Sequence, residues 1–258
     1  MSLRYVYGIV PARAAHRLDD ERLLGVDGSA VRPIVDGDLA AAASDVSEAE
    51  YGSEGLNEHV RDLEWLTPRA AAHQAVNARI LEIADVVLPL SFGALYRDDD
   101  RVREMLRENA DVRVTRLAAL AGRAEWVVTV TRDPRESPGA DDDLRELDRD
   151  IATSTPGRAF LLEKRRTTIS RAATERSDRE TADRVLGALD EVAERTYTEP
   201  VAKGGGDVVV VRISLLAPRD DADRVDARIE RLTGELSDEG YRVRASGPWP
   251  AYRFGALS

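Results

Sequence analysis

Three histidines, His16, His59 and His73, are the residues of this sequence best suited to metal or acid–base chemistry. His59 and His73 are 14 positions apart, which is about 21 Å along a straight helix. They could share a metal only if a kink at Pro68 folded one of them back. The chain has no cysteine, so thiolate ligands and disulfides are excluded. We therefore predict no metal site, and we expect the histidines to be partly buried or capping residues.

Other short motifs give no catalytic or cofactor site. The glycines at 204–206 follow a helical pattern and precede a strand, which is the reverse of a phosphate loop, so we interpret them as a connector. The aspartates at 98–100 and 141–143 lack calcium-loop spacing and are more typical of a helix start or a solvated face. No serine lies in a G-x-S-x-G elbow. The residues therefore indicate a binding or assembly module and not an enzyme.

Charge and hydropathy exclude two classes of partner. The net charge of -11, with no basic stripe, argues against nucleic acid even though tyrosines lie on the first predicted strand. No apolar run approaches the ~18 residues that span a bilayer, and residues 1–15 do not resemble a signal peptide. We expect a cytoplasmic protein that binds neither nucleic acid nor membrane.

The charged residues are unusual in kind. Of 37 basic residues only Lys164 and Lys203 are lysines, which leaves 37 - 2 = 35 arginines, and 27 aspartates outnumber 21 glutamates. A GC-rich genome explains the arginines, whereas the acidic excess favours adaptation to high salt. We favour a halophilic source, and GC bias stays open as the alternative.

Hydrophobic periodicity predicts strands and helices in alternation along the chain. The predicted strands span residues 3–10, 31–35, 39–46, 86–95 (broken at Pro89), 125–131, 208–216 and 241–246. The predicted helices span about 55–83, from 98–100 to near 122, 156–197 with a possible restart at the capping box 177–180, and from Val225 to before Gly240. From Glu125 onward the order is close to a ferredoxin-like βαββαβ unit with one strand missing. The fold class is therefore α+β.

The segment 247–258, "GPWPAYRFGALS", concentrates scarce aromatic residues in Trp249, Tyr252 and Phe254. Pro248 and Pro250 predict extended backbone and no helix there. The rings could fold back and seal the core, or they could stay exposed as a partner-binding anchor. We favour docking against the body of the protein.

Five segments, taken together and in this order, resemble the gas vesicle GvpF/GvpL family. They are "YVYGIV" (5–10), "VVLPLSFGALYRDDD" (86–100) preceded by His73, "GRAEWVVTV" (122–130), "TPGRAFLLEKR" (155–165) and "GPWPAYRF" (247–254). The resemblance implies two α+β domains, which we place at 1–122 and 123–258. The second would be a modified ferredoxin-like fold with long helices and the aromatic C-terminal tail. The charged stretches 132–150 and 163–184 match no family motif, so no role is carried onto them.

The resemblance also implies a function. It indicates a minor gas vesicle component, or an assembly accessory protein, that binds the hydrophobic major shell protein and limits its aggregation during nucleation. Other gas vesicle accessory proteins would be further partners, and the location would be the gas vesicle and the cytoplasm. No cofactor is expected. The alternative is a ferredoxin-like regulatory module that binds a small effector.

Overall fold

A computed structural model describes residues 2–52, 55, 59, 61–134, 142–201 and 206–255. Helices are combined with antiparallel sheets, which confirms the α+β class. The contacts divide the chain into two compact units. Unit 1 contains residues 1–125, 218–220 and 247–258, and unit 2 contains residues 126–217 and 221–246. This division lies three residues from the predicted boundary after residue 122, but it groups the aromatic tail with unit 1 and not with the second domain.

The sheet of unit 1 is built around strand β1 (Ser2–Pro11). Its strand order is β2-β3-β1-β4, and β5 also pairs with β1. All of these pairings are antiparallel. The other strands are β2 (Arg32–Asp36), β3 (Leu39–Ser47), β4 (Leu88–Pro89) and β5 (Leu95–Tyr96). The predicted strand 86–95 is thus two short strands on either side of a turn.

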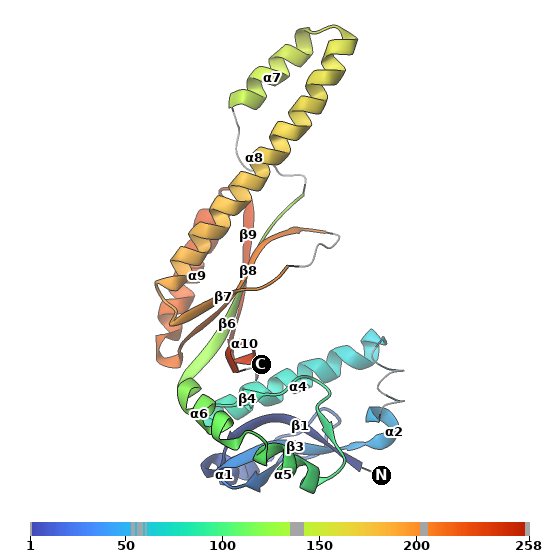
Figure 1. Cartoon of the computed structure of the whole chain (residues 1–258), viewed down its shortest axis with the longest axis vertical. Helices are drawn as coiled ribbons and strands as arrows, with labels where there is room; N and C mark the ends of the chain where they lie inside the picture. The colour runs from blue at the N-terminus through green and yellow to red at the C-terminus, as the bar shows by residue number, and fades with distance from the viewer. Residues whose placement is uncertain are drawn as a thin grey trace. The chain divides into compact units, whose positions relative to one another are not determined.

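Helices cover this sheet (Figure 1). They are α1 (Ala15–Asp20), α2 (Glu48–Tyr51), α4 (Leu63–Ala84), α5 (Asp99–Arg107), α6 (Ala110–Leu120) and α10 (Tyr252–Gly255). Asp62 caps α4 by accepting a hydrogen bond from the Glu64 N–H at 2.9 Å. Pro68 lies in the second turn of α4. Most of the predicted helix before Asp62 lies outside the described residues.

Strand β1 serves both faces of the sheet because successive side chains point to opposite sides. Tyr5 is fully buried and contacts His73 of α4. Its neighbour Arg4 bonds Asp99 of α5. Helices α4 and α5 therefore lie on opposite faces of the sheet. The register of β1 with β3 shifts between Val6 and Gly8, which marks a bulge in the strand.

Unit 2 has the sheet order β7-β8-β6-β9, and its strands and longer helices follow the order β6-α7-α8-β7-β8-α9-β9 along the chain. The bounds are β6 (Arg123–Arg132), α7 (Asp142–Thr153), α8 (Pro156–Asp190), β7 (Arg195–Thr198), β8 (Val208–Pro218), α9 (Ala222–Ser237) and β9 (Tyr241–Trp249). The strand that the prediction lacked is β7, which pairs antiparallel with β8. Helices α8 and α9 pack side by side against the sheet (Figure 1).

Four predictions for the helices need correction. The single helix predicted from 98–100 to near 122 is two helices, α5 and α6, separated at Glu108 and Asn109. Helix α8 runs without a break through the capping box 177–180, and it ends at Asp190 instead of near 197. An additional helix, α7 (Asp142–Thr153), packs against α8. Helix α10 begins at Tyr252, two residues after Pro250, although the prolines predicted no helix in the tail. Because Pro250 precedes the helix, its missing N–H removes none of the helical hydrogen bonds.

Gly8 allows close packing behind β1, and its replacement tests that packing. A Cβ at this position would lie 2.5 Å from Val87 Cγ2 and 3.0 Å from the Leu88 carbonyl oxygen. We expect Gly8→Ala to lower the free energy of unfolding by about 1–3 kcal/mol, the range for an overpacked core. The measurement is chemical denaturation. Gly187→Ala is the control, since a Cβ there meets nothing within 4 Å and a helical alanine should stabilise by up to about 1 kcal/mol. Equal stability of the two variants would contradict this account.

Candidate functional site

The candidate site is the aromatic tail and the part of unit 1 that it contacts. Trp249 ends β9 and is half-buried. Tyr252 and Phe254 belong to α10, where Tyr252 is half-buried and Phe254 is 9 % exposed. The three rings therefore differ in burial: Phe254 is a core residue, whereas Trp249 keeps part of its surface in solvent.

Short α10 is held to unit 1 by polar and apolar contacts. The Arg253 N–H donates to the buried Glu125 carboxylate at 2.7 Å, and the Arg116 guanidinium donates to the Gly255 carbonyl at 3.4 Å. A Cβ on Gly255 would lie 3.5 Å from Leu88 and 3.6 Å from Leu120, so the backbone of α10 approaches β4 and α6 closely. A carboxylate that caps the first turn of a helix also complements the helix dipole.

Tyr252 connects the tail to a buried polar cluster. Burial raises the pKa of the Tyr252 hydroxyl to about 12, against the opposing effect of a hydrogen-bonding interaction with the Asn77 side chain. Tyr252 Oη and Asn77 Oδ1 are both buried, and neither atom forms a hydrogen bond of normal geometry with any described residue. The amide Nδ2 of Asn77 lies 3.1 Å from His73 Nε2, and His73 Nδ1 lies 2.9 Å from the Tyr5 hydroxyl. The tail thus adjoins a chain of polar groups that reaches β1.

His73 is enclosed by aromatic rings. Its ring stacks on Tyr7 at 5.7 Å between centroids and meets Tyr5 and Phe92 edge-on at 5.7 and 5.8 Å. The side chain is 3 % exposed. Burial lowers the pKa of the imidazole, since the charged form would lose its hydration.

The two tyrosines of this cluster are also held in their neutral forms. Burial raises the pKa of Tyr7 to about 12 and raises the pKa of Tyr5 as well. The Tyr7 hydroxyl accepts the Val26 N–H at 2.9 Å and lies 2.8 Å from Ser44 Oγ. The Tyr5 hydroxyl accepts the Gly93 N–H at 3.1 Å. These rings therefore fix the loops around residues 26 and 93 against β1.

Neutral buried groups of this kind stabilise a fold through packing and hydrogen bonds. Over the described residues, no three histidine, aspartate or glutamate side chains come close enough together to hold a metal ion. None of the described helices is long and apolar enough to cross a membrane. The arrangement supports packing and binding chemistry.

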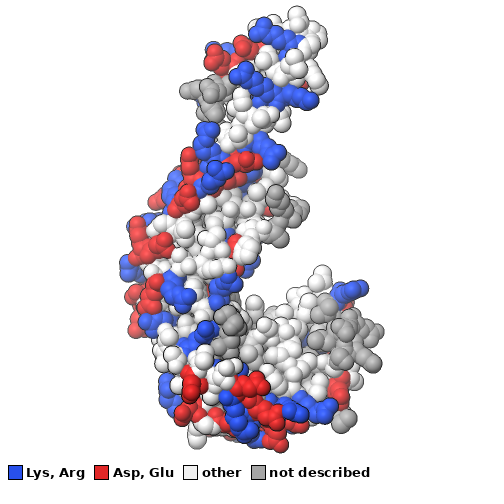
Figure 2. Space-filling model, in the orientation of Figure 1, with Lys and Arg blue, Asp and Glu red and all other residues white. Residues whose placement is uncertain are grey.

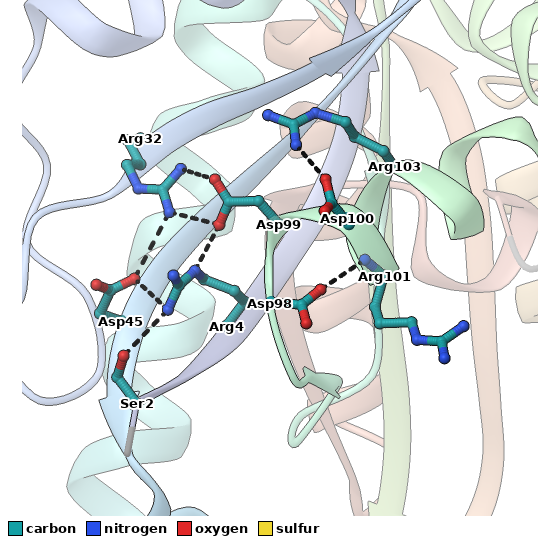
Figure 3. Close-up of polar contacts among 9 residues, drawn as sticks. All are labelled: Ser2, Arg4, Arg32, Asp45, Asp98, Asp99, Asp100, Arg101 and Arg103. Carbon is teal, nitrogen blue, oxygen red and sulfur yellow. Dashed lines mark hydrogen bonds and ion pairs between the residues drawn. The ribbon is translucent and has the colours of Figure 1, made fainter.

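On the opposite face of the sheet, the three adjacent aspartates have three different environments (Figure 3). Asp98 caps α5 by accepting the Arg101 N–H at 2.9 Å. Asp99 accepts from Arg4 Nε at 2.6 Å and from both terminal nitrogens of Arg32, at 2.7 and 2.9 Å. Asp100 pairs with a surface arginine one turn along α5.

The Asp99 cluster joins β1, β2, β3 and α5. Asp45 of β3 completes it, with its carboxylate 3.1 Å from Arg4 and 3.7 Å from Arg32. The hydrogen bonds from Arg32, followed by those from Arg4, lower the pKa of Asp99 to about 2. The forked geometry of arginine suits a carboxylate that must accept several donors. This cluster fixes the position of α5 on the sheet.

Sequence reasoning found the three tail rings and the helix start at 98–100, but it missed their partners. Asn77 and Glu125, which face the tail, carry no local signal. Arg4 and Arg32 lie 95 and 67 positions from Asp99. The only available signal was the position of His73 and "YRDDD" inside the motifs that carry the family resemblance.

Comparisons with known proteins all find gas vesicle proteins. The family model described as "Gas vesicle synthesis protein GvpL/GvpF" matches residues 3–256. The chain is 32 % identical to "Gas vesicle protein F" of Streptomyces sp. (strain CB03234), over 97 % of this chain and 98 % of that protein. It is 29 % identical to "Gas vesicle protein L" of the same strain, over 99 % and 94 %. The crystal structure of GvpF from Anabaena sp. PCC7120 has the same fold, with a TM-score of 0.77 at 16 % identity over all of both chains.

Replacing Asp99 tests the cluster on the α5 face. We expect Asp99→Asn to lower the free energy of unfolding by roughly 1–2 kcal/mol, between the values for exposed and buried ion pairs, because Arg4 and Arg32 lose their shared carboxylate. Denaturant titration is the measurement. Asp100→Asn is the matched control: its carboxylate is 86 % exposed, and a surface pair should change stability by about 0.5 kcal/mol or less. If both variants unfolded like the parent, the cluster would make no measurable contribution to the free energy of unfolding.

The buried histidine predicts a pH dependence of stability. In the unfolded chain, His73 takes up a proton below the ordinary histidine pKa of about 6.5, whereas in the folded protein its lowered pKa keeps it neutral. The free energy of unfolding should therefore fall as the pH drops from 7.5 to 5.5. One such group contributes at most about 1.4 kcal/mol per pH unit. His73→Gln should flatten the profile measured by denaturation. His16→Gln, at a side chain 87 % exposed, should leave it unchanged. A parent-like slope in His73→Gln would assign the effect to other groups.

Proposed function

Because the chain belongs to the gas vesicle synthesis protein GvpL/GvpF family, we propose that it is a gas vesicle assembly accessory protein. In this proposal it binds the hydrophobic major shell protein and limits its aggregation during nucleation. The observation that carries the proposal is the family match over residues 3–256, nearly the whole chain. The action is stoichiometric binding without catalysis or cofactor. It takes place in the cytoplasm and on the vesicle, with other gas vesicle proteins as further partners.

The charge of the protein suits this role. An apolar shell subunit must be shielded before assembly, since exposed apolar surface drives aggregation. A partner with a net charge of -11 makes the complex repel its neighbours while the apolar face is covered. The same acidic excess is the basis of the halophilic interpretation, which we retain as part of the proposal.

The tail supplies a partner-binding element in which the three rings have different roles. Phe254 is buried and holds α10 on unit 1, and Tyr252 lies against the polar cluster at Asn77. Trp249 is half-buried between two prolines, at the end of a strand whose residues 244–248 are exposed. A partly exposed tryptophan on restrained backbone binds with little loss of conformational entropy. We assign partner contact to Trp249 and docking to Phe254.

A ferredoxin-like description of unit 2 is also part of this proposal. Its support is the element order βαββαβ together with the sheet order β7-β8-β6-β9. The long helix α8 and the added helix α7 would be the modifications of that fold.

A second candidate function, binding of a small effector, is favoured by one observation. A cavity of about 360 Å³ in unit 1 is lined mostly by apolar residues, including Leu39, Val114 and Leu117, together with Arg13 and Asp38. This volume is at the low end for ligand sites. A metabolite that strongly raised the melting temperature would support this candidate.

The main test is co-expression with the major gas vesicle shell protein. We expect the two proteins to co-purify and the shell protein to stay in the soluble fraction. Trp249→Ala should reduce capture about tenfold and, because the ring is only half-buried, should destabilise the protein less than Phe254→Ala. Phe254→Ala should unfold more easily, by about 3–5 kcal/mol, as for a buried phenylalanine.

Tyr197→Ala, which removes a ring 37 % exposed in unit 2, is the control and should capture like the parent. Absence of co-purification, with both proteins present and folded, would remove the shell-protein proposal. Full capture by folded Trp249→Ala would remove the assignment to the tail alone.

A further inference from the structure

Helix α7 and the first half of α8 form a hairpin that extends beyond the sheet of unit 2 (Figure 1). The seam between the two helices buries Leu147, which is 8 % exposed. The other large apolar residues along the seam, Leu144, Ile151, Leu162 and Ile169, are only half-buried. The pairing of α7 with α8 therefore leaves part of the apolar surface of the hairpin exposed to solvent.

The outward side of α8 carries two strongly exposed apolar residues. Phe160 is 61 % exposed and Leu161 is 66 % exposed. In the sequence, Phe160 and Leu161 lie between Ala159 and Leu162, which are half-buried and face the seam. Helical spacing therefore turns Phe160 and Leu161 away from α7. Large apolar residues next to each other on an exposed helix face are typical of a binding surface.

Basic residues surround this apolar pair. Residues 156–171 contain five basic and one acidic residue, a net charge of 5 - 1 = +4 in a chain whose total is -11. Arg158, Lys164 and Arg165 are exposed and form no ion pair with any residue in the described ranges. The ammonium of Lys164 lies 5.9 Å from the Phe160 ring centroid. Figure 2 shows Lys and Arg atoms beside uncharged surface at this end of the hairpin, with Asp and Glu atoms also present there.

We propose that this surface, formed by Phe160, Leu161, Lys164 and Arg165, binds an amphipathic helix of a partner protein. The partner helix has an apolar stripe, which covers Phe160 and Leu161, and acidic residues along its flanks, which pair with Arg158, Lys164 and Arg165. In helix-on-helix recognition of this kind, the bound helix presents apolar anchor residues one turn apart. The site is separate from the tail and does not depend on the identity of the shell protein as a partner.

Charge argues against two other occupants. A second copy bound across a two-fold axis would place the same basic faces of α8 against each other. An anionic membrane would repel the rest of a chain of net charge -11. Lipid-binding clusters usually carry four to eight basic residues, compared with the three here that have no ion pair within the described ranges. An acidic helix satisfies both the apolar and the charged part of the surface.

The test uses the full chain and two synthetic helices of about 18 residues, which make five turns. Both peptides have leucine at the a and d positions, and one has glutamate and the other lysine on the flanking positions. Fluorescence anisotropy at low salt should show the glutamate peptide binding at least about tenfold more tightly than the lysine peptide. Salt should weaken that binding. Phe160→Ser/Leu161→Ser and Lys164→Glu/Arg165→Glu should each weaken it at least about tenfold.

Matched controls keep the test specific. Arg176→Glu/Arg179→Glu reverses two exposed charges farther along α8, and Leu24→Ser removes an apolar side chain 67 % exposed in unit 1. Both should bind like the parent, and circular dichroism melts should show all variants folded. Equal binding of the two peptides, or binding unaffected by the hairpin variants, would overturn the proposal. Two other results would also overturn the proposal if neither peptide bound. One is self-association in sedimentation that the hairpin variants abolish. The other is binding to phosphatidylglycerol vesicles that the hairpin variants abolish.

Discussion

Strand β1 must satisfy two different environments at once, and the organisation of unit 1 depends on it. One face presents Tyr5 and Tyr7 to α4 and its buried histidine, while the other presents Arg4 to the carboxylates of α5 and β3. A shift of register by one residue would exchange these faces and place an arginine among aromatic rings. The register with β3 shifts at the bulge before Gly8, and the missing side chain of Gly8 leaves room for Val87 and Leu88 to approach.

The two faces are stabilised by different kinds of interaction. The α4 face relies on neutral groups, with tyrosine hydroxyls and an uncharged imidazole that hydrogen bond to one another and to loop backbone. The α5 face relies on charge, since Asp99 is shared by two arginines and Asp45 by the same two. High salt screens charged contacts at the surface but leaves buried neutral contacts largely unaffected. Unit 1 therefore combines one salt-sensitive face with one that depends little on ionic strength.

Periodicity in the sequence predicted most strands of both units, because apolar alternation is a local property. It failed where polar composition hid an element. Helix α7 is rich in aspartate and arginine, and β7 is a short polar strand, "RTYT", at the end of a helical pattern. At the candidate site, Trp249, Tyr252 and Phe254 stood out by type, but their partners Asn77, Glu125 and Leu88 did not. Those contacts join residues more than a hundred positions apart, and periodicity carries no information about pairing at that separation.

The path of the chain gives the tail a consequence for biosynthesis. Unit 1 is interrupted after residue 125, and its last segment, residues 247–258, is made only after unit 2 has been translated. During synthesis, the surfaces of Leu88, Leu120 and Glu125 that receive α10 stay uncovered while the intervening residues are made. Domains that fold during translation usually do so in order from the N-terminus. Here the N-terminal unit is the last to be completed, so a ribosome that stops within unit 2 leaves both units unfinished.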